Sequence, residues 1–183
     1  MAFVSWLQFG SASWLAFFHG IPRFSQTFLY NGDQLWWKLQ SLYAFVRYVG
    51  GSETLAWTVH AIVVGTVAVA LVVIWRSQRR YAIKAAALAL GTLLTTPYLY
   101  MYDMVVLAIT VAFVVREGLD GGFEPDEPIV LAGTMMLAST FLLVAEPVGL
   151  AANLLLAGLI LRRAGLAWPT ARVDVQQSSH RCI

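Results

Sequence analysis

The residues of this chain that are best suited to chemistry lie in one aromatic turn, residues 96–103 (TPYLYMYD), between two strongly apolar runs. Its one carboxylate, Asp103, could bind a phosphate through a cation, orient a hydroxyl group, or act as a base. It could equally cap a helix expected over residues 104–115, because Asp is favoured at helix N-termini. An ionisable group at or below a bilayer surface is costly, so Asp103 is expected to have a task or a partner.

Three tyrosines accompany this carboxylate: Tyr98, Tyr100 and Tyr102. Their rings could stack on a sugar, but tyrosines at a membrane surface usually form an aromatic belt. Two cations upstream, Lys38 and Arg47, are the types that pair with a lipid phosphate or with bulk headgroups.

Other polar residues offer less specific chemistry. A lone membrane histidine such as His60 is expected to bond a neighbouring helix. Glu146, before a proline, is a second carboxylate or a turn residue. The acidic loop at 124–127 could attract a divalent cation or simply be solvated. Cys182 has no cysteine to pair with.

The composition excludes an ordinary soluble domain. The chain of 183 residues is 59% hydrophobic and 12% charged, whereas soluble domains carry about 25% charged residues. The mean hydropathy is +0.69. Several apolar runs therefore indicate an all-α integral membrane bundle. A net charge of +2 without a basic block gives no indication of nucleic-acid binding.

Hydropathy and charge predict about five transmembrane helices. Residues 57–75 form the clearest span, and residues 82–115 and 129–161 read as two short hairpins broken at Pro97 and Pro147. The segments predicted to be cytoplasmic hold nine basic residues and the two outer turns hold none: Arg76, Arg79, Arg80, Lys84, Arg116, Arg162, Arg163, Arg172 and Arg181. The positive-inside rule then places the N-terminus outside and the C-terminus in the cytoplasm.

This layout divides the chain into three parts. Residues 1–56 are expected to be a non-cytoplasmic, interfacial helical segment, and residues 57–163 the transmembrane bundle. Residues 164–183 read as a cytoplasmic tail. Within the first part, residues 35–49 resemble an amphipathic interfacial helix that ends at Gly50. Residues 1–20 could be a further span, an interfacial helix, or the cut end of a longer protein.

Several short motifs then carry a family resemblance. They are FG at 9–10, WLAF at 14–17, WKLQS at 37–41, VGG at 49–51, AAAL at 85–88 and TPYLYMYD at 96–103. In this order, over roughly residues 7–165, they resemble the C-terminal half of bacterial glycosyltransferase family 87, whose members are similar to polyprenyl-phosphate-mannose-dependent mannosyltransferases of the GT-C type.

The resemblance implies a membrane hexosyltransferase of the bacterial inner membrane, which takes mannose from a polyprenyl-phosphate carrier on the non-cytoplasmic face. It implies that Lys38 and Gln40 contact the lipid phosphate and that Asp103, with Tyr98 and Tyr102, lines the substrate cavity. No residue is assigned as catalytic and no metal ligand is expected, although a divalent cation stays open as an alternative.

GT-C enzymes usually carry their catalytic carboxylate in the first outer loop of an N-terminal half. No such half is found in this sequence, which therefore reads as a truncated or split member with a companion chain. The rival interpretations are a non-catalytic accessory subunit or remnant, and a small transporter built on two matching hairpins.

Overall fold

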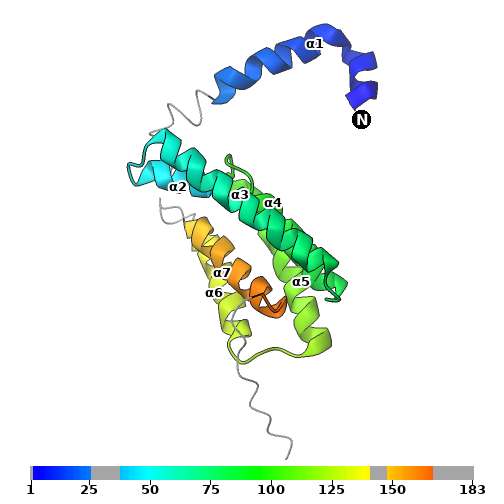
Figure 1. Cartoon of the computed structure of the whole chain (residues 1–183), viewed down its shortest axis with the longest axis vertical. Helices are drawn as coiled ribbons and strands as arrows, with labels where there is room; N and C mark the ends of the chain where they lie inside the picture. Colours follow the sequence, from blue (N-terminus) through cyan, green and yellow to red (C-terminus); the bar gives the residue numbers. More distant parts are fainter. Residues whose placement is uncertain (1, 26–37, 141–147, 167–183) are drawn as a thin grey trace, which may run out of the picture.

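A computed structural model describes residues 2–25, 38–140 and 148–166, and these are helical almost throughout (Figure 1). The helices are α1 (Ala2–Ser25), α2 (Leu42–Tyr48), α3 (Glu53–Arg76), α4 (Tyr81–Leu94), the 3₁₀ helix η3 (Met101–Met104), α5 (Val105–Gly121), α6 (Glu127–Thr140) and α7 (Val148–Arg163). Within the described residues the extended backbone is limited to one isolated bridge between Leu39 and Tyr100. The all-α prediction is confirmed for this part of the chain.

Helix α3 is the long apolar helix of the bundle. It begins at Glu53 rather than at the expected Trp57, because Ser52 caps it: the Ser52 hydroxyl accepts a hydrogen bond of 3.2 Å from the Leu55 N–H. Its 24 residues rise about 36 Å. Of the described helices, α3 has the length and hydropathy to cross a membrane by itself.

The other bundle helices are shorter. α4, α5, α6 and α7 have 14, 17, 14 and 16 residues, below the roughly 20 that span a bilayer. They form the two short hairpins that the sequence predicts, α4 with α5 and α6 with α7. Since one helix meets the criterion for a span, the arrangement of five spans is not confirmed.

The core is centred on α4, which packs on α3, α5 and α7. Ala86 and Leu90 of α4, Leu107 of α5 and Leu156 of α7 are buried there. The outward faces of these helices are also apolar: Val69 of α3 and Met136 of α6 are 65% and 74% exposed. A bundle that is apolar on both faces fits a lipid environment better than water.

The N-terminal part departs from its expected boundaries. Figure 1 shows α1 apart from the other helices, and Gly10 (φ 72°, ψ 170°) interrupts it. Each piece is therefore shorter than a straight span. Of the interfacial helix expected at 35–49, residues 38–49 are described, and in them the α-helix is α2, which ends before Gly50 in the left-handed region (φ 87°). The expected boundary between residues 56 and 57 falls inside α3.

Candidate functional site

Two segments that lie far apart in the sequence meet at one end of the bundle. Leu39 and Tyr100 form the isolated antiparallel bridge, and the Gln40 N–H donates a hydrogen bond of 2.7 Å to the Leu99 carbonyl. The Ser41 hydroxyl donates to the Pro97 carbonyl at 2.6 Å, across 56 residues of sequence. The structure thus brings together the two segments that carry the most specific part of the resemblance. We call residues 38–41 and 97–104 the turn clamp.

Ser41 also starts α2. Its hydroxyl oxygen accepts a hydrogen bond of 3.2 Å from the Ala44 N–H, which is the usual role of a serine N-cap. One buried hydroxyl therefore fixes the beginning of α2 and holds it against the aromatic turn.

Gln40 joins a third element to the clamp. The Gln40 side chain is 2% exposed, and its Oε1 accepts a hydrogen bond of 2.8 Å from the Gly149 N–H in the first turn of α7. A Cβ atom at position 149 would lie 2.8 Å from that oxygen and 3.0 Å from Cε of Met104. Only glycine allows this close approach. In this structure the buried Gln40 side chain connects the turn clamp to α7, whereas the family resemblance led us to expect a contact with lipid phosphate.

Asp103 closes the aromatic turn on itself. Its Oδ2 accepts a hydrogen bond of 3.0 Å from the Tyr100 N–H, and its own N–H donates to the Tyr100 carbonyl at 3.0 Å. The capping alternative is therefore correct in kind, but the capped element is η3. The expected helix 104–115 is α5, which begins at Val105 with no side-chain cap from Met104. Asp103 itself is half-buried within the clamp.

The three tyrosines of the turn have different surroundings. Tyr98 packs with Tyr43, Ala56 and Trp57 under α2 and α3. Tyr100 and Tyr102 stack in parallel, with ring centroids 5.2 Å apart and an interplanar angle of 4°. Burial and the neighbouring Tyr102 phenol raise the pKa of Tyr100, so this group stays a neutral hydrogen-bond donor. Tyr102 is 68% exposed, so its ring is accessible from outside the bundle.

The two cations expected on this side differ in position. Lys38 is half-buried and directly precedes the bridge residue Leu39, so it lies beside the aromatic turn. Arg47 is used at the corner between α2 and α3, where its Nη1 donates to the Gly51 carbonyl at 3.0 Å. Of the two, Lys38 is the one that the structure brings to the turn clamp.

His60 links two helices, as the sequence predicts. Its side chain is 4% exposed and its ring centroid lies 6.1 Å from that of Trp57. The imidazole lies near the backbone of Thr95, the C-cap residue of α4. This position between α3 and α4 agrees with the expected structural role of the histidine.

The opposite end of the bundle holds an ion cluster that the sequence reasoning missed. The acidic loop was expected to be solvated, but Glu127 is fully buried and receives two hydrogen bonds from Arg163, one of them 2.6 Å long from Nε to Oε1. Arg162 pairs with Asp126 at 2.5 Å and with Glu124 at 3.4 Å. We call residues 124, 126, 127, 162 and 163 the ion cluster.

The ion cluster lowers the pKa of two of its own carboxyl groups. Burial alone would raise the pKa of Glu127, but hydrogen bonds from Arg163 and from the Glu124 N–H outweigh it and lower this pKa. The hydrogen bond from Arg162 lowers the pKa of Asp126. The signal available in the sequence was the placement of two arginines and three acids at the two ends of one predicted hairpin.

No metal site accompanies these groups in the described ranges. Among residues 2–25, 38–140 and 148–166, no set of three His, Cys, Asp or Glu side chains is arranged to hold an ion. The acidic loop that could have attracted a divalent cation is instead occupied by arginines. Glu146 and Cys182 lie outside the described residues.

Comparison with known proteins gives one family. The model of Glycosyltransferase family 87 matches residues 1–97, more than half of the chain. The match covers α1 to α4 and residues 38–41 of the turn clamp, and it ends at Pro97. It is shorter than the expected extent of roughly 7–165, so most of the aromatic turn lies beyond it. No curated protein and no solved structure gives a significant match.

Proposed function

Because the chain belongs to glycosyltransferase family 87, which makes it a membrane-associated protein of a glycosyltransferase family, we propose that it forms the C-terminal, donor-binding part of a GT-C-type enzyme. This part takes a hexose, mannose in our proposal, from a polyprenyl-phosphate carrier on the non-cytoplasmic face of the bacterial inner membrane. The observation that supports the proposal is the turn clamp, in which Lys38 directly precedes Leu39, the residue bridged to Tyr100 of the turn that carries Asp103.

The transfer is a substitution at the anomeric carbon. An acceptor hydroxyl forms the new C–O bond, the bond between the sugar and the lipid phosphate breaks, and the phosphate leaves with the electron pair. Positively charged and hydrogen-bonding groups favour this step by stabilising the charge that develops on the leaving group. In the proposal the Lys38 ammonium meets the phosphate and Gln40 holds the clamp in place.

The remaining clamp residues shape the sugar cavity. Asp103, already fixed by the Tyr100 N–H, lines the cavity and accepts hydrogen bonds from sugar hydroxyls through its outer lone pairs. Tyr102, which is exposed, and Tyr98 supply ring faces and hydroxyls. No catalytic carboxylate is assigned to these residues. The base belongs to an N-terminal half, encoded upstream or in a companion chain.

The topology belongs to the same proposal. The turn clamp lies outside, and the ion cluster with the basic end of α3 lies in the cytoplasm, in agreement with the charge asymmetry of the sequence. In this topology the N-terminus is outside, the C-terminus is inside, and the four short helices complete the five crossings.

A second candidate is a non-catalytic accessory subunit. It is favoured by the same hydrogen bonds: the Asp103 carboxylate is used to close η3, and the Gln40 side chain is used to hold α7. Both polar groups thus have structural roles that require no substrate.

Sugar transfer from a labelled polyprenyl-phosphate mannose distinguishes the two. Membranes that contain this chain with its N-terminal half are compared for the unchanged chain, Lys38→Gln and Asp103→Asn, with Lys84→Gln at the basic end as a matched control. We expect a loss of tenfold or more for Lys38→Gln and several-fold for Asp103→Asn, and no loss for the control. Equal transfer by all four, or none above empty membranes, would leave the accessory role.

A further inference from the structure

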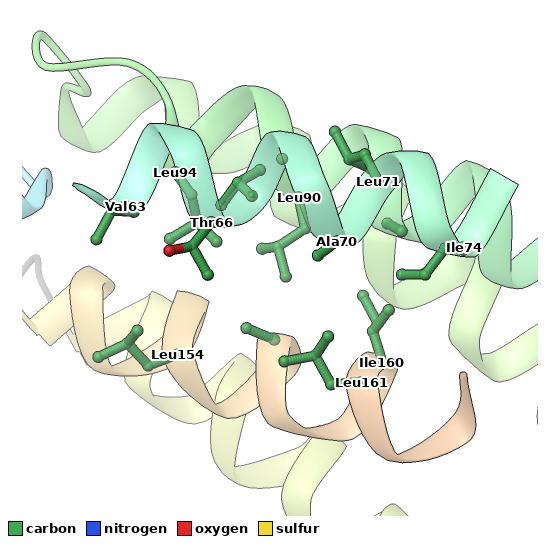
Figure 2. Close-up of a pocket in the computed structure, with 14 residues that line it drawn as sticks. Val63, Thr66, Ala70, Leu71, Ile74, Leu90, Leu94, Leu154, Ile160 and Leu161 are labelled. Atoms are coloured by element: carbon green, nitrogen blue, oxygen red, sulfur yellow. The ribbon is translucent and has the colours of Figure 1, made fainter. Parts of the chain in front are cut away.

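An apolar groove runs along α3 at the level of the hydrophobic core. Figure 2 shows its walls: Val63, Ala70 and Ile74 of α3 face Leu154 and Leu161 of α7, with Leu90 of α4 at the floor. The groove has a volume of about 230 Å³. It is separate from the turn clamp and from the ion cluster, and neither uses its residues.

The groove exists because two helices pack on the same side of α4 without closing on each other. α3 approaches α4 very closely at Gly91, where a Cβ atom would lie 3.0 Å from Leu71 Cδ1 and 3.3 Å from Val67 Cγ1. α7 also packs on α4. Between α3 and α7 stand the small side chains Ala70 and Ala157, which leave the space unfilled.

The side chains that line the groove have no free hydrogen-bond donor. The polar one among them, Thr66, donates its hydroxyl proton to the Ile62 carbonyl of the same helix at 2.8 Å. A water molecule needs at least two polar partners, so hydrocarbon suits the groove better than water.

The size of the groove selects the kind of hydrocarbon. From Val63 to Ile74, α3 rises about 16 Å. A volume of about 230 Å³ over that length suits one extended hydrocarbon chain, whose carbon atoms contact their neighbours at about 4 Å. A helix about 10 Å across needs several times more room. One extended lipid chain can therefore enter the groove, whereas a helix cannot.

Charge marks one end of the groove. Arg79 lies just beyond α3 and reaches across to the end of α7, because a Cβ atom at Gly165 would lie 2.5 Å from its Nη2. In the described part of the chain, Arg79 has no carboxylate within ion-pair distance. An arginine between the ends of the two helices that form the groove complements an anionic headgroup.

We propose that this groove binds one acyl chain of an anionic phospholipid, whose phosphate is held by Arg79. The site is independent of sugar transfer, since the turn clamp lies near the opposite end of α3. A carrier lipid whose phosphate met Lys38 would have its headgroup at that other end.

Native mass spectrometry of the full chain in mild detergent tests the proposal, because detergent removes loosely associated lipid. The chain is incubated with phosphatidylglycerol or with phosphatidylcholine of the same acyl chains, and undecaprenyl phosphate is added as a competitor. We expect one retained phosphatidylglycerol, at least fivefold more than phosphatidylcholine, and no displacement by undecaprenyl phosphate. Equal retention of the two phospholipids, or displacement by undecaprenyl phosphate, overturns the assignment.

Paired variants locate the bound lipid. Ala157→Phe fills the groove from α7, and Ala151→Phe adds the same ring on the exposed face of that helix. We expect retention to fall at least fivefold in the first and to stay unchanged in the second. Ala70→Phe and Ala68→Phe repeat the comparison on α3, in case one filled groove prevents folding. Arg79→Gln is expected to abolish the preference for phosphatidylglycerol. Unchanged retention in both filled-groove variants places the lipid elsewhere.

Discussion

The two ends of this bundle join distant parts of the chain in different ways. In the turn clamp, residues 38–41 and 97–104 are held by backbone hydrogen bonds, one hydroxyl and one buried amide. In the ion cluster, Glu127 and Arg163 are held by charge, with Glu127 fully buried. The turn clamp can change conformation without leaving an unpaired charge in the interior, whereas the ion cluster cannot. The clamp is therefore the end at which a change of conformation costs less.

The largest effect is expected at the ion cluster. Replacing Glu127 by Ala leaves the Arg163 guanidinium, of which 11% is exposed, without its buried partner. Loss of one partner of a buried pair costs about 3 kcal/mol. Thermal unfolding in detergent should show a large fall in the midpoint for Glu127→Ala. Glu124→Gln, which removes a pair between more exposed groups, should change it little, and equal falls would contradict the special role of Glu127.

At the turn clamp, Gly149→Ala should be the most damaging small change. The new methyl group would lie 2.8 Å from Oε1 of Gln40 and press on Met104, which costs about 1–3 kcal/mol. Gly158 lies in the same helix with nothing within 4 Å of its Cβ position. Gly158→Ala should instead stabilise the protein by about 0.5–1 kcal/mol. Unfolding measurements that give both variants the same sign would contradict the close contact between Gln40 and α7.

Two serine N-caps allow the extra hydrogen bond of the turn clamp to be compared with ordinary helix capping. Ser41 and Ser52 each accept a backbone N–H at 3.2 Å, but only Ser41 also donates to the Pro97 carbonyl. Each cap is worth about 1 kcal/mol, and the extra hydrogen bond adds about another 1 kcal/mol. Ser41→Ala should therefore destabilise the protein about twice as much as Ser52→Ala. Identical losses would mean that the Pro97 contact contributes nothing.

The smallest expected effect is a pH dependence. The ion cluster lowers the pKa of both Asp126 and Glu127 in the folded protein. The stability that these pairs contribute is therefore fully present above the unfolded values of about 4 and is lost as the pH falls through the lower folded values. Unfolding followed from pH 7 down to pH 3 should show this loss, and Glu127→Ala should show less of it. An unchanged pH profile in that variant would assign the loss to other carboxylates.

The sequence predicted elements better than contacts. The all-helical class, the apolar helix after Gly50 and the short hairpin broken at Pro97 follow from hydropathy and turn residues, and these are found. The N-terminus of α3 was placed four residues late, because Trp57 was taken as the start and the capping role of Ser52 was overlooked.

The pairing of distant segments could not be derived from periodicity. Nothing local in Gln40 indicates a hydrogen bond to Gly149, 109 residues away. The burial of Glu127 was likewise not predicted, because an acidic, glycine-rich loop is usually solvated and its partners lie 36 residues further on. Asp103 was ambiguous for the opposite reason: one residue type serves capping and chemistry equally well.

A disulfide across the bridge tests the turn clamp most directly. Leu39 and Tyr100 form a non-hydrogen-bonded pair, since Gln40 donates to Leu99, and the Cα atoms of such pairs are about 4.5 Å apart, within disulfide reach. In a Cys182→Ser background, Leu39→Cys with Tyr100→Cys should crosslink on mild oxidation, so that trypsin fragments cut after Arg76 stay joined until they are reduced. Fragments that separate as readily as those of a control with Leu39→Cys and Leu119→Cys would contradict the clamp.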